Sequence, residues 1–191
     1  MSSSRAILDF WFGDDTSSVQ ARGRRWFSSD PEFDRLCTER FLADHEAAAA
    51  GALNSWENDP QGCVALILLL DQFPRNMFRN TPRAFATDAQ PRDLTRHAIA
   101  ARLDRKMPAI WRAFVHMPLQ HSESLADQNE SVRLTRELVQ EHPDCAGFLK
   151  FAEAHRETIR RFGRFPHRNS ILGRTSSPGE AEFLGDNSST L

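Results

Sequence analysis

The sequence has no tyrosine, and among its 191 residues it has only two lysines (Lys106 and Lys150) and three cysteines (Cys37, Cys63 and Cys145). The lack of tyrosine excludes a phenolic general acid. Three cysteines without a Cys-x-x-Cys pair do not make a disulfide framework, and they favour a reducing compartment. We therefore expect a cytoplasmic protein whose cysteines are small core residues rather than nucleophiles.

Long apolar runs and a strong net charge are also missing. The longest apolar run, residues 64–70, is far shorter than the roughly 20 residues that cross a bilayer. The N-terminus shows no basic segment followed by an apolar stretch, the pattern of a signal peptide. The net charge of -2 gives no overall attraction to nucleic acids or anionic membranes. We expect neither as a partner.

Alternating runs typical of β-strands are absent, whereas apolar residues recur at spacings of three and four. This periodicity predicts an all-α protein. A chain of this length, 40% hydrophobic, suits one domain with a sizeable core. We predict a single all-helical domain over residues 1–184, built as a bundle or stack of antiparallel helical hairpins with seven to eight helices. Residues 185–191 are predicted to form a flexible C-terminal tail.

Proline, glycine and capping residues set the predicted helix ends. The helix that begins at residue 60 is expected to stop or kink at Pro74, and the one that begins at residue 108 to end before Pro118, because proline has no amide hydrogen. Ser177 and Glu180 have the spacing of a capping box at the start of the last helix. The expected helices cover about residues 5–12, 31–50, 60–73, 92–103, 108–117, 146–162 and 178–184, with one more, capped by Ser122 or Ser124, that reaches about residue 141.

Asp71 is a charged residue within the most apolar predicted helix. The residues three, four and seven positions before it are aliphatic, so its carboxylate projects from an apolar face and is predicted to be buried. A buried carboxylate needs a partner, and Arg75 at i+4 is the nearest one in the sequence. The pair is either a structural ion pair or part of a binding or catalytic site, and the sequence leaves both open.

A second polar stretch, His121-Ser122-Glu123 with Gln128, falls at a predicted helix start, where open backbone amides favour a carboxylate or a bound anion. Glu123 alternatively only balances the helix dipole. His121 and Glu123 are chemically suitable metal ligands, but no His-Glu-x-x-His or Glu-x-x-His pair puts two ligands on one helical face. We therefore predict no metal and no other cofactor.

The third polar stretch, from His155 to Arg174, contains six arginines and a single acid, Glu157. His155 shares an apolar helix stripe and is predicted to face inward. This local positive charge needs acidic partners. Either carboxylates of the protein such as Asp71 and Glu123 supply them, or a ligand phosphate or carboxylate does, since guanidinium groups bind both with paired hydrogen bonds.

Together these three stretches resemble a known bacterial family. The segments 69–76, 121–123 with Gln128, and 161–169, in this order, are similar to those of the family catalogued as domain of unknown function 924. The likeness covers nearly the whole chain, from residues 7–12 to the final short helix. The resemblance implies an all-helical fold similar to tetratricopeptide-type helical hairpins. It implies no activity.

Our functional hypothesis is that the polar stretches meet in one cleft that binds a small anionic metabolite bearing a phosphate or carboxylate group. Turnover of that ligand is a second step, and the sequence leaves open whether the protein is an enzyme. The alternatives are a helical interaction module that binds a peptide or protein, and a purely structural salt-bridge network. The candidate catalytic residues are Asp71, His121 and His155, and the candidate ligand-binding residues are Arg75, Asn76, Glu123, Gln128, Arg164, His167, Arg168 and Asn169.

Overall fold

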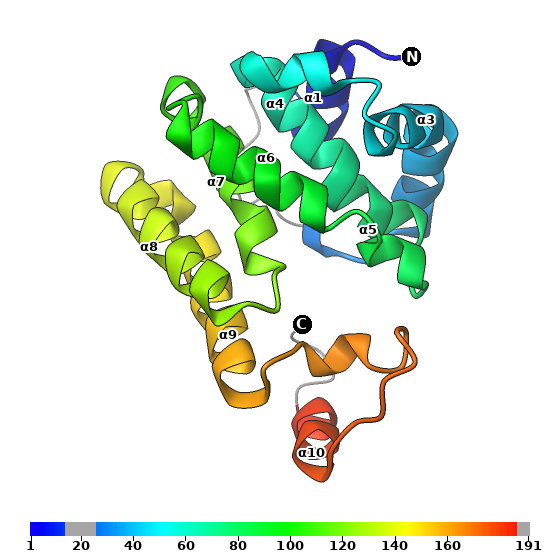
Figure 1. The fold of residues 1–191 in the computed structure, drawn as a ribbon, viewed down its shortest axis with the longest axis vertical. Helices are drawn as coiled ribbons and strands as arrows, with labels where there is room; N and C mark the ends of the chain where they lie inside the picture. The colour runs from blue at the N-terminus through cyan, green and yellow to red at the C-terminus, as the bar shows by residue number, and fades with distance from the viewer. Residues whose placement is uncertain (14–25, 187–191) are drawn as a thin grey trace.

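The protein is all-helical in the computed structural model, which describes residues 1–13 and 26–186 (Figure 1). A π-helical segment, Leu68–Gln72, joins α4 to α5 in one continuous helix. With this helix counted once, the described residues form eight helices and no strand, which confirms the predicted all-α bundle. The helices are α1 (Ser4–Phe12), α3 (Pro31–Ala49), α4 (Pro60–Ile67), α5 (Phe73–Met77), α6 (Ala89–Ala100), α7 (Ala109–Gln120), α8 (Leu125–Glu141), α9 (Ala146–Phe162) and α10 (Pro178–Asp186).

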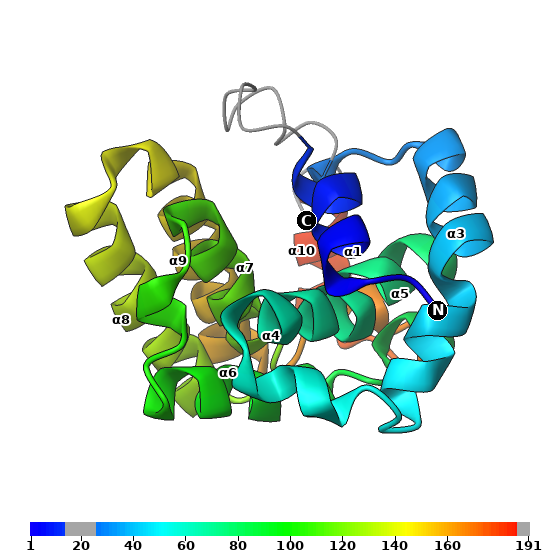
Figure 2. The same ribbon diagram turned by 90° about the horizontal axis from the view of Figure 1, so that it is seen from above.

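Helix α4 lies at the centre of the molecule, as Figure 2 shows, and packs against α1, α6 and α7. Residues 62–70, which belong to α4 and the π-helical segment after it, are all buried. A helix in this position has no side exposed to water, which agrees with its lack of a polar face. Five aromatic rings join α1, α3, α5 and α7 in a continuous cluster beside it. They belong to Phe10, Trp11, Phe33, Phe73 and Phe114.

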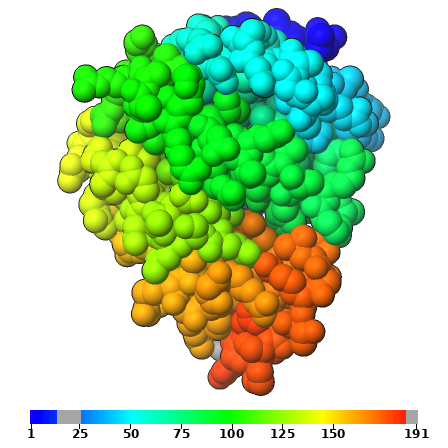
Figure 3. Space-filling view, viewed as in Figure 1, coloured from blue at the N-terminus to red at the C-terminus, as the bar shows by residue number. Residues whose placement is uncertain are grey.

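Helices α7, α8 and α9 form the other side of the bundle, with α8 packed against both neighbours. Beyond α9 the chain returns toward α5 through the 3-10 helix Pro166–Arg168 and then forms α10, the last element of the described residues. We call residues 164–186 the C-terminal segment. Figure 3 shows this segment, coloured orange to red, as the lower end of the molecule, in contact with the surface of the earlier helices. No helix of the described residues is both long and apolar enough to cross a membrane.

Two helix ends differ from the sequence prediction. Helix α7 runs through Pro118 to Gln120, so the predicted end before Pro118 is wrong. Residues 112–120 of α7 are all buried, and this packing outweighs the backbone hydrogen bond lost at the proline. The hydroxyl of Thr95 also donates to the Val115 carbonyl, 2.7 Å away, one turn before the proline. Helix α6 begins at Ala89 and ends at Ala100, three residues earlier than predicted at each end.

The last helix begins as predicted. The Ser177 amide donates to the Glu180 carboxylate at 2.7 Å, and the Glu180 amide donates to the Ser177 hydroxyl at 3.3 Å, which is a capping box. Helix α10 continues to Asp186, two residues into the segment predicted to be a tail. The remainder of that predicted tail, residues 187–191, lies outside the described residues.

Candidate functional site

The π-helical segment sets the geometry of the site. Pro74 has no amide hydrogen, so it cannot donate a hydrogen bond to the carbonyls of Leu70 and Leu69, four and five residues before it. Side chains donate to both instead: His45 Nδ1 to the Leu69 carbonyl at 2.8 Å and the Thr87 hydroxyl to the Leu70 carbonyl at 2.7 Å. The helix therefore does not stop at Pro74 but changes to π geometry before it, an irregularity that is frequent at functional sites.

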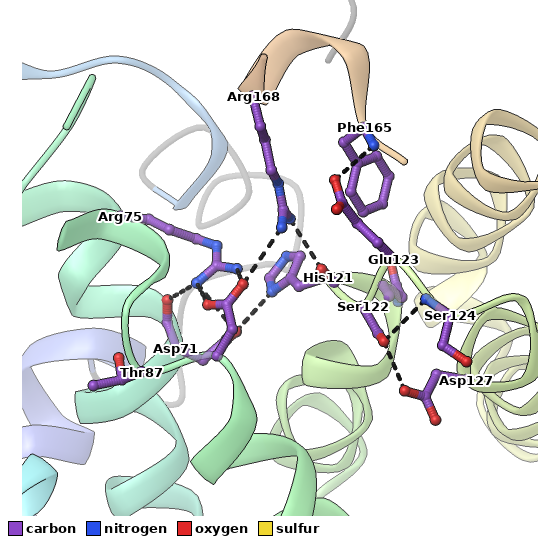
Figure 4. A network of polar contacts seen from close by, with 12 residues as sticks. Asp71, Arg75, Thr87, His121, Ser122, Glu123, Ser124, Asp127, Phe165 and Arg168 are labelled. Carbon is purple, nitrogen blue, oxygen red and sulfur yellow. Dashed lines mark hydrogen bonds and ion pairs between the residues drawn. The ribbon is translucent and has the colours of Figure 1, made fainter. Parts of the chain in front are cut away.

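Asp71 lies within the π segment, and its side chain is fully buried. Its carboxylate accepts hydrogen bonds from His121 Nδ1, at 2.8 and 2.9 Å to its two oxygens (Figure 4). It also accepts one from Gln72 Nε2 at 2.5 Å. Arg75 forms an ion pair with it at 3.2 Å, the partner predicted from the i+4 spacing. Burial raises the pKa of the Asp71 carboxyl, but Arg75 and His121 lower it more, so the pKa lies below its ordinary value and Asp71 is charged.

His121 follows the last residue of α7 and turns its ring toward Asp71. Because Nδ1 carries the hydrogen donated to Asp71, Nε2 is the unprotonated nitrogen of the neutral ring. Nε2 makes no hydrogen bond with any described residue, and the ring lines a cavity. Burial, with Arg75, lowers the pKa of His121 despite the opposing effect of Asp71. The site therefore holds a neutral imidazole with an open proton-accepting nitrogen.

Asp88 joins two arginines behind the cavity wall. Arg75 Nη2 donates to it at 3.1 Å and Arg168 Nη1 at 3.4 Å, while Arg168 Nη2 donates to the His121 carbonyl at 3.0 Å. The Arg168 guanidinium is stacked between the rings of Phe85 and Phe165, 4.6 and 4.5 Å from their centroids. Burial, together with Arg75, lowers the pKa of Arg168 to about 10. Arg168 thus fastens the C-terminal segment to the rest of the site.

The cavity has a volume of about 360 Å³ and lies between α5, α7, α9 and the C-terminal segment. No acidic residue lines it in the part of the chain that the structure describes. The carboxylates of Asp34, Asp71 and Asp88 instead lie behind the lining and pair with it. The ionisable side chains that line it are all basic: Arg75, Arg79, Arg168, His121, His155 and His167.

His155 and His167 face the same cavity as His121. The His155 ring stands nearly perpendicular to the His121 ring, with 6.4 Å between their centroids. Burial, with nearby positive groups, lowers the pKa of His155 to about 3 and that of His167 to about 4. Both rings are therefore neutral near pH 7, and each offers one hydrogen-bond donor and one acceptor.

Comparison with known proteins places the sequence in one family. A family model described as a bacterial protein of unknown function (DUF924) matches residues 7–188. The chain belongs to this family. A solved structure of a protein of unknown function from Agrobacterium tumefaciens is similar to this DUF924 protein, with 37% sequence identity and a TM-score of 0.86. The match covers 96% of this chain and 97% of that one. Among curated proteins, none matches the sequence.

Two of the predicted ligand-binding residues of this DUF924 protein hold the loop between α7 and α8 and do not line the cavity. Glu123 accepts from the Phe165 amide at 2.8 Å and from both terminal nitrogens of Arg174, at 2.7 and 2.9 Å. Gln128 donates to the carbonyls of Gln120 and Ser122, each at 2.7 Å. Glu123 therefore contacts the C-terminal segment and His121 contacts Asp71, although the two residues are only two positions apart in the sequence.

Two further predicted residues stabilise the C-terminal segment internally. Arg164 pairs with Glu180 through two hydrogen bonds of 2.6 and 2.8 Å, and Asn169 donates to the Ser176 hydroxyl at 3.1 Å. Neither side chain lines the cavity. The structure therefore brings seven candidates together at the cavity: Asp71 behind its wall, and Arg75, Asn76, His121, His155, His167 and Arg168 in it.

Sequence reasoning missed Asp88, Arg79 and the apolar residues of the cavity lining. The spacing of Arg79 from Arg75 and Asn76, four and three residues respectively, is a signal that could have placed it on the same face. Asp88 gave no such signal, because it stands in a loop and meets its partners only through the fold. The apolar residues of the lining are Trp26, Phe27, Ala84, Phe85, Met117 and Ile171.

Proposed function

We propose that this cytoplasmic DUF924 protein binds a small anionic metabolite, bearing a phosphate or carboxylate group, in the cavity beside His121. The observation that carries the proposal is the arrangement of charge: basic side chains line the cavity and their carboxylate partners lie behind them. An anion in the cavity gains attraction from the near positive groups, while the negative groups are farther from it. Guanidinium and imidazole N–H groups also match the acceptor oxygens of such anions.

The apolar part of the cavity lining limits the kind of anion. Trp26, Phe85 and Met117 add apolar side chains to the lining beside the basic ones. A volume of about 360 Å³ lies at the lower end of the range for small-molecule sites, about 300–1,000 Å³. A ligand with one charged end and a short apolar body fits both parts of the lining.

A peptide- or protein-binding module is the second candidate function. The observation that favours it is an exposed aromatic pair near the cavity mouth: Phe27 and Phe151 are 50% and 47% exposed, and their ring centroids are 5.7 Å apart. Exposed apolar residues that lie together are typical of interaction sites. This candidate predicts binding that depends on Phe27 and Phe151 and is unaffected by the charge of the cavity.

Calorimetric titration with inorganic phosphate, glutarate and the neutral analogue glutaramide tests the first candidate. We expect at least one anion to bind and glutaramide not to. Arg79→Gln should weaken anion binding by at least about 10-fold, because one charge-assisted contact contributes about 1.5–3 kcal/mol. Arg136→Gln is the matched control, since Arg136, like Arg79, forms an ion pair with a carboxylate of another helix but does not line the cavity.

Failure of both anions to bind would contradict the proposal, and so would equal weakening by Arg79→Gln and Arg136→Gln. A Phe151→Ser variant separates the two candidates. It should leave anion binding within about twofold if the cavity is the site, because Phe151 is exposed and does not line the cavity.

A further inference from the structure

The Asp71–His121 pair has the arrangement of a general base. We propose that His121 activates a water molecule to hydrolyse small acyl esters that carry an anionic group, an activity that rests on the anion binding proposed above. Asp71 is the positioning residue in this scheme, and His121 is the catalytic residue. The pairing itself carries the inference: a buried carboxylate holds Nδ1 through both of its oxygens, and Nε2 is left open at the cavity (Figure 4).

His121 is well prepared to accept a proton. Asp71 fixes both the orientation and the tautomer of the ring, and it stabilises the imidazolium that forms when Nε2 takes up a proton. Gln72 and Arg75 hold the Asp71 carboxylate in turn, at 2.5 and 3.2 Å. The His121 side chain is only 15% exposed, so the ring is restrained but still reaches the cavity. One of the two nitrogens of the His121 ring is therefore open toward the space where a ligand would lie.

Water is the nucleophile that this cavity favours. Among its described lining residues there is no serine, threonine, cysteine or lysine, so no hydroxyl, thiol or amine of these residues is available to form a covalent intermediate. The neutral His155 ring stands nearly perpendicular to His121 and can donate one N–H to an oxygen between them. Arg75 and Arg79 line the same cavity and would hold the anionic end of the substrate.

The reaction balances with water alone as co-reactant. His121 Nε2 takes a proton from water while the water oxygen forms a bond to the ester carbonyl carbon, and the C=O π electrons move to the carbonyl oxygen. His155 donates a hydrogen bond to this oxyanion. When the tetrahedral intermediate collapses, the C–O bond to the alcohol breaks, and the alcohol oxygen keeps the electron pair and takes the proton from His121. The products are a carboxylic acid and an alcohol, and the acid releases its proton to solvent.

Two chromogenic esters test the proposal: mono-4-nitrophenyl glutarate, which carries a carboxylate, and 4-nitrophenyl valerate, its neutral counterpart. We expect release of 4-nitrophenolate from the glutarate ester, faster than from the valerate ester. His121→Gln should lower kcat/KM by at least about 100-fold, the usual contribution of a general base. His142→Gln is the matched control and should stay within about twofold, since His142 is an exposed histidine away from the cavity.

The pH profile distinguishes a base from a structural residue. Only neutral His121 accepts a proton, so kcat/KM should rise with pH through a midpoint below the ordinary histidine value of about 6.5, because the pKa of His121 is lowered. Asp71→Asn removes the charge that raises the His121 pKa, so it should lower the plateau and move the midpoint to lower pH. A purely structural effect of Asp71→Asn would reduce the amount of folded enzyme without moving the midpoint.

Glutarate binding is measured by calorimetry on the same preparations, which separates the two proposals. If glutarate binds but the ester is not hydrolysed faster than in buffer, or if His121→Gln is as fast as wild type, the catalytic proposal is refuted and the binding proposal stands. If neither glutarate nor phosphate binds, the binding proposal is refuted as well. Equal losses in His121→Gln and His142→Gln would assign the hydrolysis to unspecific histidine reactivity and also refute the catalytic role.

Discussion

Substitution of Thr87 by valine tests how the π-helical segment is held. The Thr87 hydroxyl donates to the Leu70 carbonyl at 2.7 Å, next to the position where Pro74 supplies no amide hydrogen. Valine keeps the branched shape of threonine but removes this donor. An acceptor left without its partner costs about 1–3 kcal/mol, and Thr87 is partly exposed, so water offsets some of that loss. We expect a destabilisation of about 1–2 kcal/mol.

Thr158→Val is the matched control. The Thr158 hydroxyl donates to the Ala154 carbonyl at 3.0 Å, but this carbonyl lies inside the regular helix α9, where a backbone amide also serves it. We expect this change to stay within about 0.5 kcal/mol. For a chain of this size, 1–2 kcal/mol corresponds to a fall in Tm of about 2–8 °C. Urea unfolding followed by circular dichroism measures the free energies, and differential scanning calorimetry measures Tm.

Equal stability of the Thr87 and Thr158 variants would refute the reasoning, because it would show that the Leu70 carbonyl does not depend on a side-chain donor. Glutarate binding gives a second measurement. The π segment that carries Leu70 also carries Asp71, so we expect Thr87→Val to weaken glutarate binding as well as stability, whereas Thr158→Val should leave binding unchanged.

Two further predictions concern the C-terminal segment and pH. Glu123→Ala should raise amide hydrogen exchange in residues 164–176 and lower the free energy of unfolding by about 2–4 kcal/mol, because it removes three hydrogen bonds to a charged group. Glu157→Ala is the control and should change neither quantity, because the ion pair of Glu157 is exposed. The free energy of unfolding should fall as pH drops below about 6.5, because burial lowers the pKa of His155 in the folded state and the unfolded chain therefore binds more protons. His155→Gln should flatten this dependence in urea titrations from pH 7 to pH 5, and an unchanged slope would contradict the assignment.

Local features of the fold were predictable from the sequence because each depends on residues close in the chain. The burial of Asp71 followed from its aliphatic neighbours within two helical turns, and its pairing with Arg75 followed from the i+4 spacing. The capping box of Ser177 and Glu180 spans three residues. These interactions form within one element, so the packing of other helices hardly alters them.

The interactions that define the candidate site join distant residues, and the sequence could not specify them. Asp71 and His121 are 50 positions apart, and Arg168 and Asp88 are 80 apart. Their pairing depends on how α5, α7 and the C-terminal segment pack. The π segment adds a further difficulty, because one wider turn rotates every later side chain relative to an α-helical projection. The direction of Asn76 could therefore not be extrapolated from α4.

The structure also shows why a closed salt-bridge network and an open pocket were hard to distinguish from the sequence, since this molecule contains both. Glu123 with Arg174 and Arg164 with Glu180 satisfy each other and fasten loops, so substitutions there should act on stability. His121 differs, because Asp71 satisfies one ring nitrogen and thereby leaves the other unprotonated and open to the cavity. Under the proposed mechanism the two nitrogens of this ring have different roles: removal of the Nδ1 partner should cost stability and shift the pH midpoint, whereas blocking Nε2 with a ligand should abolish turnover without unfolding the chain.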